Sequence, residues 1–588
     1  MTCLRSSAAG LAAALLAAAG AVAQPQGDVI ASSLGEIDPL LIGVRRDPAQ
    51  FGPSALGQDQ WYGSDLQSIA DAASRAPAES GSLAASELAA LVLETPGRSP
   101  EGAGDPVETT RARAAALLEL GRVDAVDMIL TQTPGALADP ARAALAVNAR
   151  LVKDDKDAAC GIANGLARGR EAPFWIRLRV ACLIWSGDDA TAELTLDLMA
   201  ERAGELADEA FATWARAAQN ERAPSDPPAP RDAIEASLAR TAEYDYAVED
   251  VEQAPFLVAL IAALDTNAGA EARATAAERA ALNAALGPVE LSDILNIAAP
   301  SDGRSPAELI EAGRADPTAL GDALLRRAAR APNPATAAEA LAADLGRQSS
   351  PAAFVVEARL AHDALVAVPP SRELIGIAPT LALGAAAAGE VELAYAWLDP
   401  RADEQAASRR GAFANVFGGP PGAPDLSSSP LEPVIRTAAE AVVAAADPAA
   451  TPRRLAEVAE ARLATTMNSG EALRAEARRD VLILLALGAE SSPALRRAAD
   501  AALIEAAPPG AEAEQSVRTA RLAAQAGAIG EAALRSASAA AAAGPGHAPT
   551  YAAVIEITRA LGLSADARAF AVEAMLASRV GDPDAAFR

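Results

Sequence analysis

A turn signature that recurs about every 33 residues is the feature that most constrains the fold of this chain. It stands at Gly121, Lys153 and Gly187, at successive intervals of 32 and 34 residues. A glycine often ends a helix in the left-handed conformation, and a small residue early in the next helix lets the two helix axes come close. Each unit is therefore predicted to be a hairpin of two antiparallel helices.

The small residue stands five positions after the turn, as Ala192 does after Gly187. Val126 and Lys153 depart from the small residues expected at their positions. The same offset recurs further along, and the predicted repeat-turn glycines are Gly121, Gly187, Gly389, Gly527 and Gly562. An alanine-rich chain also produces such pairs by chance, and this alternative stays open.

A period of 34 residues, with one small residue at the turn and another early in the second helix, resembles the tetratricopeptide repeat. The resemblance is partial, because most of that family's tryptophan, tyrosine and terminal proline positions are not matched. It implies an all-α fold, an α-solenoid of stacked antiparallel helical hairpins in which each hairpin contacts mainly its neighbours. Such a solenoid presents a concave surface that can hold a protein or a peptide.

An aromatic stripe marks one of these hairpins as an anchor of the core. Trp175, Leu178, Cys182 and Trp185 follow one another at spacings of three, four and three residues, with Phe174 beside them. This spacing places them on one helical face. Aromatic residues make up only 3% of the chain, so Phe174, Trp175 and Trp185 are predicted to anchor the core. A ligand-binding aromatic box is the alternative, and simple packing is favoured over it.

The first 23 residues have the pattern of a secretory signal peptide. Arg5 is their only charge, an apolar run spans positions 11–16, and Ala21-Val22-Ala23 supplies small residues at a cleavage site. Cleavage near Ala23 would leave 49 basic and 78 acidic residues, so the mature protein would carry a net charge near −29. We therefore expect a periplasmic or secreted protein. Its acidity disfavours nucleic acid as a partner, and no apolar run reaches the roughly 18 residues of a membrane span.

Cys160 and Cys182 are the two cysteines that remain after this cleavage, which also removes Cys3. Export would place them in an oxidising compartment, where disulfides persist. The turn between their helices centres near Glu171, eleven residues from each, so an antiparallel hairpin brings the two to about the same level. A disulfide between Cys160 and Cys182 is predicted, and two buried free thiols are the alternative.

Breaks rich in proline and glycine divide the chain. The predicted order is a signal peptide (1–23), an irregular N-terminal segment and cap (24–106), repeats like those of tetratricopeptide proteins (107–222), a helical middle region (232–417), a Pro/Gly/Ser linker (418–432) and C-terminal helical repeats (433–588). In the N-terminal segment, Ser64 and Gln67 form a candidate capping box after Trp61 and Tyr62. This aromatic pair is expected to cap the first apolar face of the solenoid, and an exposed aromatic contact is the alternative.

The residue inventory argues against catalysis. His362 and His547 are the only histidines, and no GxSxG, P-loop or dinucleotide glycine signature is present, so no enzyme, cofactor or metal site is predicted. The 78 acidic residues leave carboxylate pairs for glycan cleavage open. Asp245, Glu249 and Glu252 are expected on one helical face, where a solvated surface is favoured over a divalent cation or a basic partner.

The leading hypothesis is an exported, periplasmic helical-repeat protein that acts as a protein–protein interaction scaffold in the cell envelope. The alternative is a peptidoglycan-handling enzyme or its accessory subunit. The helical part resembles the superhelical shell of soluble lytic transglycosylases in being alanine-rich and exported, although no lysozyme-like Glu-Ser catalytic helix is evident. More broadly, residues 61–202 are similar to uncharacterised alanine-rich envelope proteins of high-GC Gram-negative bacteria, a resemblance that implies no known activity.

Overall fold

Several helices of this chain begin with a short polar capping side chain that is followed by a proline. The Asp139 carboxylate accepts a hydrogen bond from the Arg142 amide (3.0 Å), and Pro140 is the first residue of the helix. At Ser305 the hydroxyl accepts from the Glu308 amide (3.4 Å), and the Glu308 carboxylate accepts from the Ser305 amide (2.7 Å). Each cap satisfies amides that have no partner within the helix.

The computed structural model describes residues 38–43, 56–100, 102–201, 208–298, 303–399 and 431–580. Contacts divide the chain into Met1–Asp38 and Pro39–Arg588, and every described helix belongs to the second unit. The predicted signal peptide and residues 418–430 of the predicted linker lie outside the described residues. The described part is all-α, with 29 α-helices, three short 3-10 helices and no strand, which is compatible with a helical-repeat protein.

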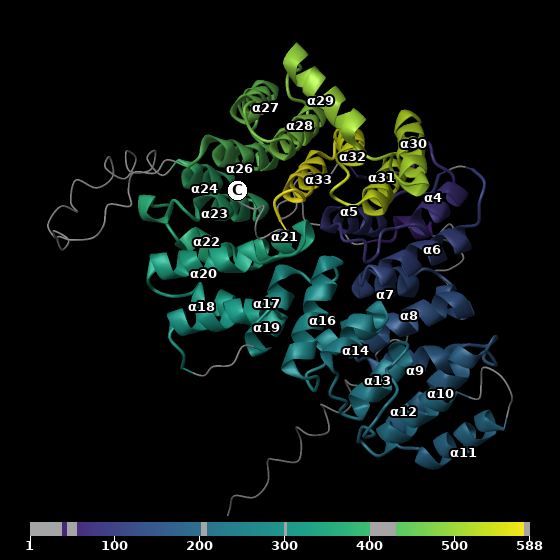
Figure 1. The fold of residues 1–588 in the computed structure, drawn as a ribbon. Helices are drawn as coiled ribbons and strands as arrows, with labels where there is room; N and C mark the ends of the chain where they lie inside the picture. The colour runs from purple at the N-terminus through teal and green to yellow at the C-terminus, as the bar shows by residue number, and fades with distance from the viewer. Residues whose placement is uncertain are drawn as a thin grey trace, which may run out of the picture. The chain divides into compact units, whose positions relative to one another are not determined.

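We describe these helices in chain order as four consecutive groups (Figure 1). The first comprises η1 (Pro39–Leu41), α4 (Leu66–Ala73), α5 (Leu83–Glu94), α6 (Pro106–Glu119), α7 (Val123–Gln132) and η2 (Ala136–Ala138). The second comprises α8 (Pro140–Val152), α9 (Lys156–Gly165), α10 (Pro173–Trp185), α11 (Asp189–Ala200), α12 (Glu209–Gln219), α13 (Ala233–Thr241), α14 (Val248–Gln253), α15 (Phe256–Leu264), α16 (Ala270–Leu282) and α17 (Pro288–Ala298). The third comprises α18 (Pro306–Ala315), α19 (Ala319–Ala328), α20 (Pro334–Gly346), α21 (Pro351–Leu360), α22 (His362–Ala367), η3 (Arg372–Leu374), α23 (Ala378–Ala387) and α24 (Val391–Leu398). The fourth comprises α26 (Pro433–Ala446), α27 (Pro452–Thr466), α28 (Glu471–Ala486), α29 (Pro493–Glu505), α30 (Ala511–Gln525), α31 (Ile529–Ala543), α32 (Ala548–Ala560) and α33 (Ser564–Leu576).

The repeat-turn glycines lie at helix ends in the left-handed conformation. Their φ angles are 73° at Gly121, 76° at Gly187, 89° at Gly389, 80° at Gly527 and 80° at Gly562. After each one the next amide donates to the carbonyl five residues earlier, as in the bond from Arg122 to Leu117 (2.8 Å). The residues five positions after the glycines are all buried: Val126, Ala192, Ala394, Ala532 and Ala567. This pattern satisfies the last carbonyls of one helix and lets the next helix approach closely.

Two sequence expectations about turns and caps are wrong in detail. The turn predicted at Lys153 lies one residue later, because Asp154 is the left-handed residue (φ 58°). The capping box of Ser64 and Gln67 does not form, because the chain stays extended through Asp65, whose carboxylate caps α4 by accepting from the Ser68 amide (2.7 Å). The Ser64 hydroxyl instead donates to the Glu531 carboxylate (3.0 Å).

Buried side chains gather in two clusters that we call the repeat core and the terminal core. The repeat core takes its residues from one stretch of chain, between Ala143 and Ala319. The terminal core combines residues between Leu40 and Ala149 with residues between Leu309 and Leu576. The N-terminal helices therefore share a core with helices that follow several hundred residues later.

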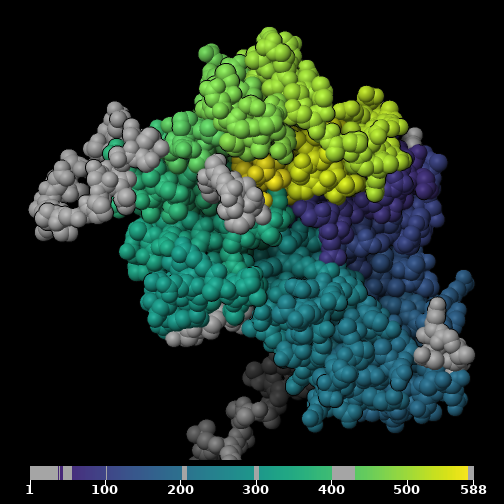
Figure 2. Space-filling view, in the orientation of Figure 1, coloured from purple at the N-terminus to yellow at the C-terminus, as the bar shows by residue number. Residues whose placement is uncertain are grey.

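The meeting of α4 and α5 with α31 and α33 creates this shared core (Figures 1 and 2). Trp61 is 1% exposed, and a Cβ added at Gly530 of α31 would lie 2.7 Å from its ring. The Gly530 amide also donates to the Gln60 carbonyl (2.8 Å). Trp61 thus packs against a C-terminal helix, whereas Tyr62 is 75% exposed. The solenoid interpretation expected each hairpin to contact mainly its sequence neighbours. The contacts of α5 with α31 and α33 depart from this expectation.

The aromatic residues of α10 differ in how deeply they are buried in the repeat core. Trp175 is buried, whereas Phe174 and Trp185 are half-buried and pack against the core from outside. The Trp185 indole donates to the Thr241 hydroxyl (3.1 Å). Phe211 and Trp214 of α12, which also belong to the repeat core, are both fully buried.

Candidate functional site

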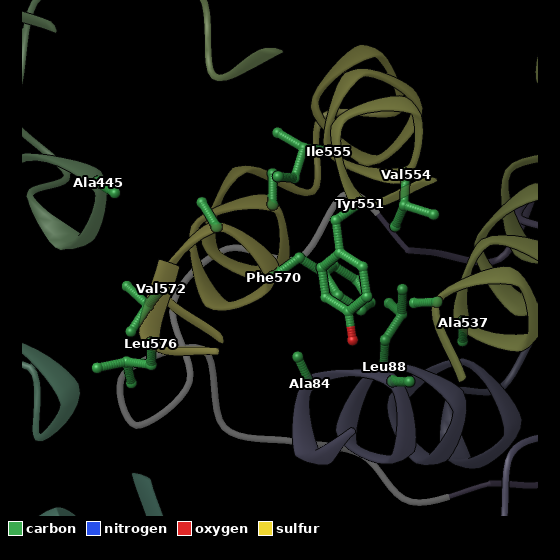
Figure 3. Packing of buried hydrophobic residues seen from close by; sticks show 14 of the residues in the cluster. Ala84, Leu88, Ala445, Ala537, Tyr551, Val554, Ile555, Phe570, Val572 and Leu576 are labelled. Carbon is green, nitrogen blue, oxygen red and sulfur yellow. The ribbon is translucent and has the colours of Figure 1, made fainter. Parts of the chain in front are cut away.

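A buried polar latch joins α5 to α32 and α33 at the junction of the two ends of the unit. Ser82, the N-cap residue of α5, donates its hydroxyl to the Glu573 carboxylate (2.6 Å), and the Leu83 amide donates to the other carboxylate oxygen (2.8 Å). The Tyr551 hydroxyl lies 3.1 Å from the Ser82 hydroxyl and 3.3 Å from Glu573. Figure 3 shows Tyr551 pointing from α32 toward α5, between Ala84 and Leu88.

Burial changes the protonation of this latch. Glu573 is 2% exposed, and its burial raises its pKa to about 7, although the hydrogen bonds from Ser82, Leu83 and Tyr551 act in the opposite direction. Burial and the nearby Glu573 carboxylate raise the pKa of Tyr551 as well. Glu573 therefore titrates near neutral pH, while Tyr551 stays a neutral phenol.

A pocket of about 310 Å³ opens beside the latch, and we call it the junction pocket. It is bounded by α5, α21, α23, α24, α26 and α33, which come from the first, third and fourth helix groups. Its apolar lining includes Leu83, Ala84, Val355, Ala387, Val391 and Val572. Its volume is within the range of small-ligand sites.

Four charged side chains line the junction pocket, and three of them have close partners in the protein. Arg359 and Glu87 form a two-bond ion pair, of which one bond measures 3.3 Å, and Glu573 belongs to the latch. Arg568 differs, because its guanidinium donates to a backbone oxygen, the Ala445 carbonyl (3.1 Å). Within the described residues, no carboxylate lies within 4.0 Å of its guanidinium. Burial lowers the pKa of Arg568, against the opposing effect of Asp447.

A second group of titratable residues lies buried among α16, α19, α20 and α21. The Glu357 carboxylate pairs with Arg326, and the nearby Asp344 is completely buried, with no hydrogen-bond partner for its carboxyl oxygens among the described residues. Burial raises the pKa of Glu278 to about 8 and that of Asp322 to about 6, and it raises the pKa of Asp344 strongly. Burial among other acidic groups disfavours the charged form of each of these three carboxyls.

Arg326 connects this carboxyl cluster to a second pocket of about 570 Å³. Most of the other lining is apolar, from α17, α19, α20, α21 and α22, and includes Leu295, Ala337, Leu360 and Val368. Arg326 is already neutralised by Glu357, and Arg330 and Asp363 are the other charged residues that line this pocket.

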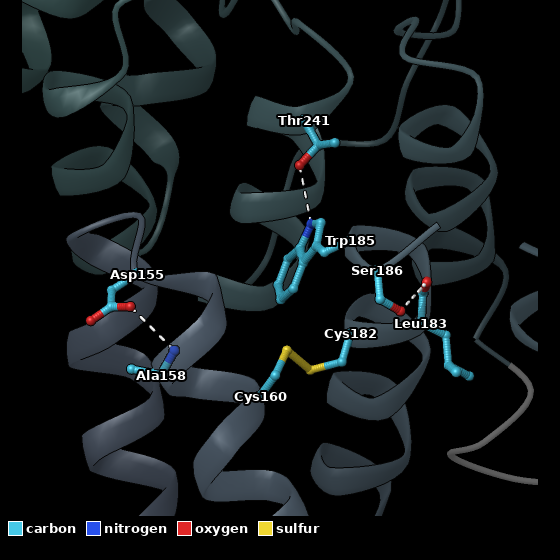
Figure 4. Close-up of a disulfide and its surroundings, with 8 residues drawn as sticks. All are labelled: Asp155, Ala158, Cys160, Cys182, Leu183, Trp185, Ser186 and Thr241. Atoms are coloured by element: carbon cyan, nitrogen blue, oxygen red, sulfur yellow. Dashed lines mark hydrogen bonds between the residues drawn. A yellow bond between two sulfur atoms is a disulfide. The ribbon is translucent and has the colours of Figure 1, made fainter. Parts of the chain in front are cut away.

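The structure brings Cys160 of α9 and Cys182 of α10 to disulfide distance, with their Cα atoms 5.7 Å apart (Figure 4). They lie beside Trp185 at the edge of the repeat core, and neither lines the junction pocket. Among the predicted turn residues, only Gly389 lines that pocket. The residues singled out from sequence therefore do not converge on one site.

The two histidines have structural partners. His362 lies 2.9 Å from the Glu390 carboxylate and 3.1 Å from that of Asp363, and these hydrogen bonds raise its pKa. His547 caps α32, where its Nδ1 accepts from the Thr550 amide (3.3 Å).

The acidic face expected near α14 is not formed as predicted. Asp245 precedes the helix, and its carboxylate accepts from the Gly269 amide (2.9 Å), whereas Glu249 and Glu252 lie within α14. The backbone is extended at Ala247 (ψ 156°), which is the N-cap residue of α14, so Asp245 lies outside the helix. Across the described ranges, no group of three or more His, Cys, Asp or Glu side chains is arranged to hold a metal ion. No described helix has both the length and the apolar character to cross a membrane.

Sequence reasoning missed the residues of the junction. Ser82 and Glu573 are separated by 491 positions, and neither belongs to a recognisable motif. Arg568 and Glu573 stand in the run ADARAFAVEAML, whose charged residues are separated by apolar ones without marking a functional motif. The sequence offered one weak sign that Glu573 is buried, because apolar residues flank it on both sides.

Comparisons with protein-family models, curated proteins and solved structures gave no match to this chain.

Proposed function

We propose that this protein is an exported helical-repeat protein that binds another protein or a peptide in the cell envelope, and that the junction pocket is its binding site. One observation carries the proposal. The pocket is a recess of about 310 Å³ with a mostly aliphatic lining and a half-buried arginine, Arg568, for which the described residues supply no ion-pair partner. Binding sites of proteins commonly combine an apolar recess with a few placed polar groups.

The assignment to a repeat architecture like that of tetratricopeptide proteins belongs to this proposal. It is supported by left-handed glycines at the ends of α6, α10, α23, α30 and α32, each followed by a helix with a buried small or aliphatic residue. Export is supported by the pattern of residues 1–23 and by two cysteines at disulfide distance, which suit an oxidising compartment. The net charge of −28 favours a protein partner over nucleic acid.

Site-specific photocrosslinking tests the proposal. Ala387, which lines the junction pocket, would be replaced by benzoylphenylalanine in the full chain, and Leu194, a 60% exposed residue of α11, by the same group as a control. Irradiation of intact cells should give one adduct of defined mass at position 387 and none at position 194. An equal pattern at both positions, or no adduct at either, would contradict the proposal.

One observation favours a second function, the handling of peptidoglycan. Glu573 lines the pocket with a pKa raised to about 7, and a carboxyl that is partly protonated at neutral pH suits a general acid in glycan cleavage. Both of its oxygens already accept hydrogen bonds from the latch, so the structural role takes precedence. Purified peptidoglycan incubated with wild type and Glu573→Gln decides this question. Release of soluble fragments by the wild type alone would establish the second function.

A further inference from the structure

The chemistry of the junction pocket indicates the class of ligand, an inference that rests on the proposed function. The two arginines in its wall are in different electrostatic states. Arg359 is neutralised by Glu87 through two bonds, whereas in the described part of the chain the Arg568 guanidinium donates to the Ala445 carbonyl alone. A guanidinium carries five N–H donors, so most of those of Arg568 are available to a ligand.

The surroundings of Arg568 favour an anion. It is half-buried on α33, and the acidic group whose charge acts on it most is Asp447, which lies beyond ion-pair distance. The other carboxylates of the pocket, Glu87 and Glu573, are held by Arg359 and by the latch. An arginine that loses water without gaining a carboxylate leaves its charge poorly compensated, and a ligand carboxylate can bind it through two parallel N–H bonds.

The remaining wall selects the body of the ligand. Val355, Val391 and Val572 belong to three different helices, and alanines fill most of the surface between them. Such a wall contacts an aliphatic group well and gives no aromatic surface for stacking. The volume of about 310 Å³ is enough for one aliphatic side chain and its neighbouring backbone, or for a short alkyl chain.

We propose that the junction pocket binds an aliphatic group that carries a carboxylate, with Arg568 pairing with the carboxylate and the valine-rich wall enclosing the aliphatic part. The last residue of a polypeptide and a short fatty acid share this chemistry. The half-exposed pair of Glu87 and Arg359 adds an acceptor and a donor that suit the peptide bond of the first source.

Calorimetric titration of the full chain tests the ligand class. The probes are acetyl-Ala-Ala-Val with a free carboxylate, the same peptide as its amide, octanoate and octanol. At least one acid should bind about tenfold or more tightly than its neutral partner, because a partly buried charge pair contributes on that scale. Arg568→Gln should abolish this discrimination and Arg568→Lys should retain part of it, while the exposed Arg521→Gln on α30 should change nothing.

The outcomes separate this inference from the proposed function. Equal affinity of acid and neutral probes, or full discrimination in a folded Arg568→Gln protein, overturns the carboxylate assignment and leaves the crosslinking result untouched. Discrimination for octanoate alone, without an adduct at position 387, supports the carboxylate site and contradicts the protein partner. Discrimination for the peptide acid, together with loss of the adduct when that peptide is present in excess, supports both. Circular dichroism and the melting temperature of each variant establish that it is folded.

Discussion

The repeat core and the terminal core hold the same kind of helix together in different ways. Every buried residue of the repeat core comes from one stretch, between Ala143 and Ala319, and a cysteine pair with a sequence separation of 22 lies at its edge. The terminal core joins helices as far apart as α5 and α33, through contacts that span about 490 residues. Hydrophobic hairpin packing can therefore be local in one region of a chain and depend on distant segments in another.

This difference has an energetic consequence. Local hairpins form with little loop-closure entropy, whereas the junction of α5 with α31 and α33 must recover the cost of bringing distant segments together. The junction contains large buried aromatic residues, whose burial supplies such energy, together with a buried polar latch. We expect substitutions at the junction to have the larger effects and to act on both ends of the described unit.

The largest effect is expected for Trp61→Ala. The indole is fully buried against Gly530 of α31, and its removal leaves a large cavity at the junction. Aromatic-to-alanine substitutions in cores cost about 3–5 kcal/mol, so the urea midpoint should fall sharply. Hydrogen exchange should show lost protection in both α5 and α31, while α10 of the repeat core keeps its protection.

Tyr62→Ala is the matched control for this prediction, because the neighbouring side chain is 75% exposed. Its free energy of unfolding, measured by urea denaturation, should stay within about 0.5 kcal/mol of the wild-type value. Equal losses in the two variants, or loss of protection in α10 along with α5, would show that the two cores are not energetically distinct.

The next effect is expected in the repeat core, from removal of the cysteine pair. A crosslink that closes a loop of this length stabilises a fold by about 3 kcal/mol when its geometry is unstrained. Cys160→Ala with Cys182→Ala should lower the urea midpoint by a corresponding amount and reduce protection in α9 and α10. Reductant should reproduce this loss in the wild type and leave the double variant unchanged. Alkylation of both cysteines in denatured, unreduced protein would show that no crosslink is present.

The polar latch should make the terminal core sensitive to pH. The pKa of Glu573 is about 7 in the fold and 4.5 as its ordinary value, so protonation favours the folded state. This contribution is complete below pH 4.5 and is lost as the pH rises through about 7, at a cost of about 2–3 kcal/mol. Glu573→Gln, which stays neutral, should lack this loss. The measurement is the difference between the urea midpoints of the two proteins at pH 5 and pH 8, and parallel curves would exclude the latch as its cause.

The contrast between the cores also explains what the sequence could predict. Helix ends depend on local rules, so the positions of Gly187 and Gly389 could be identified from the residues around them. The Ser64 capping box failed because Asp65, an equally good cap, stands one position later. Helical periodicity identifies an apolar face but not the face that it contacts, so the packing of Trp61 on α31 could not be predicted.

The residues of the junction pocket could not be predicted from the sequence for the same reason, because tertiary contacts bring them together. Arg568 and Glu573 belong to no local motif, and their partners lie far away in the sequence, on α26 for Arg568 and at the start of α5 for Glu573. The aromatic residues show the limit even within the repeat core. Phe174, Trp175 and Trp185 were predicted to anchor it, yet Trp175 is buried while Phe174 and Trp185 are half-buried. Hydrophobicity identifies residues that can be buried, whereas tertiary contacts determine which of them are buried completely.

The smallest effects are expected for alanine substitutions at two turn glycines, which compare the cores at equal backbone geometry. Gly121 and Gly187 have φ angles of 73° and 76°, so an alanine is strained similarly at both, by about 1 kcal/mol. A Cβ at Gly187 meets nothing within 4 Å, whereas one at Gly121 would lie 2.4 Å from the Ala285 side chain. Because overpacking adds a further cost, Gly121→Ala should destabilise by about 2–3 kcal/mol and Gly187→Ala by about 1 kcal/mol in urea unfolding. Equal losses would mean that the contact between α6 and the loop after α16 relaxes freely, and that the two cores are less tightly joined there than the distance indicates.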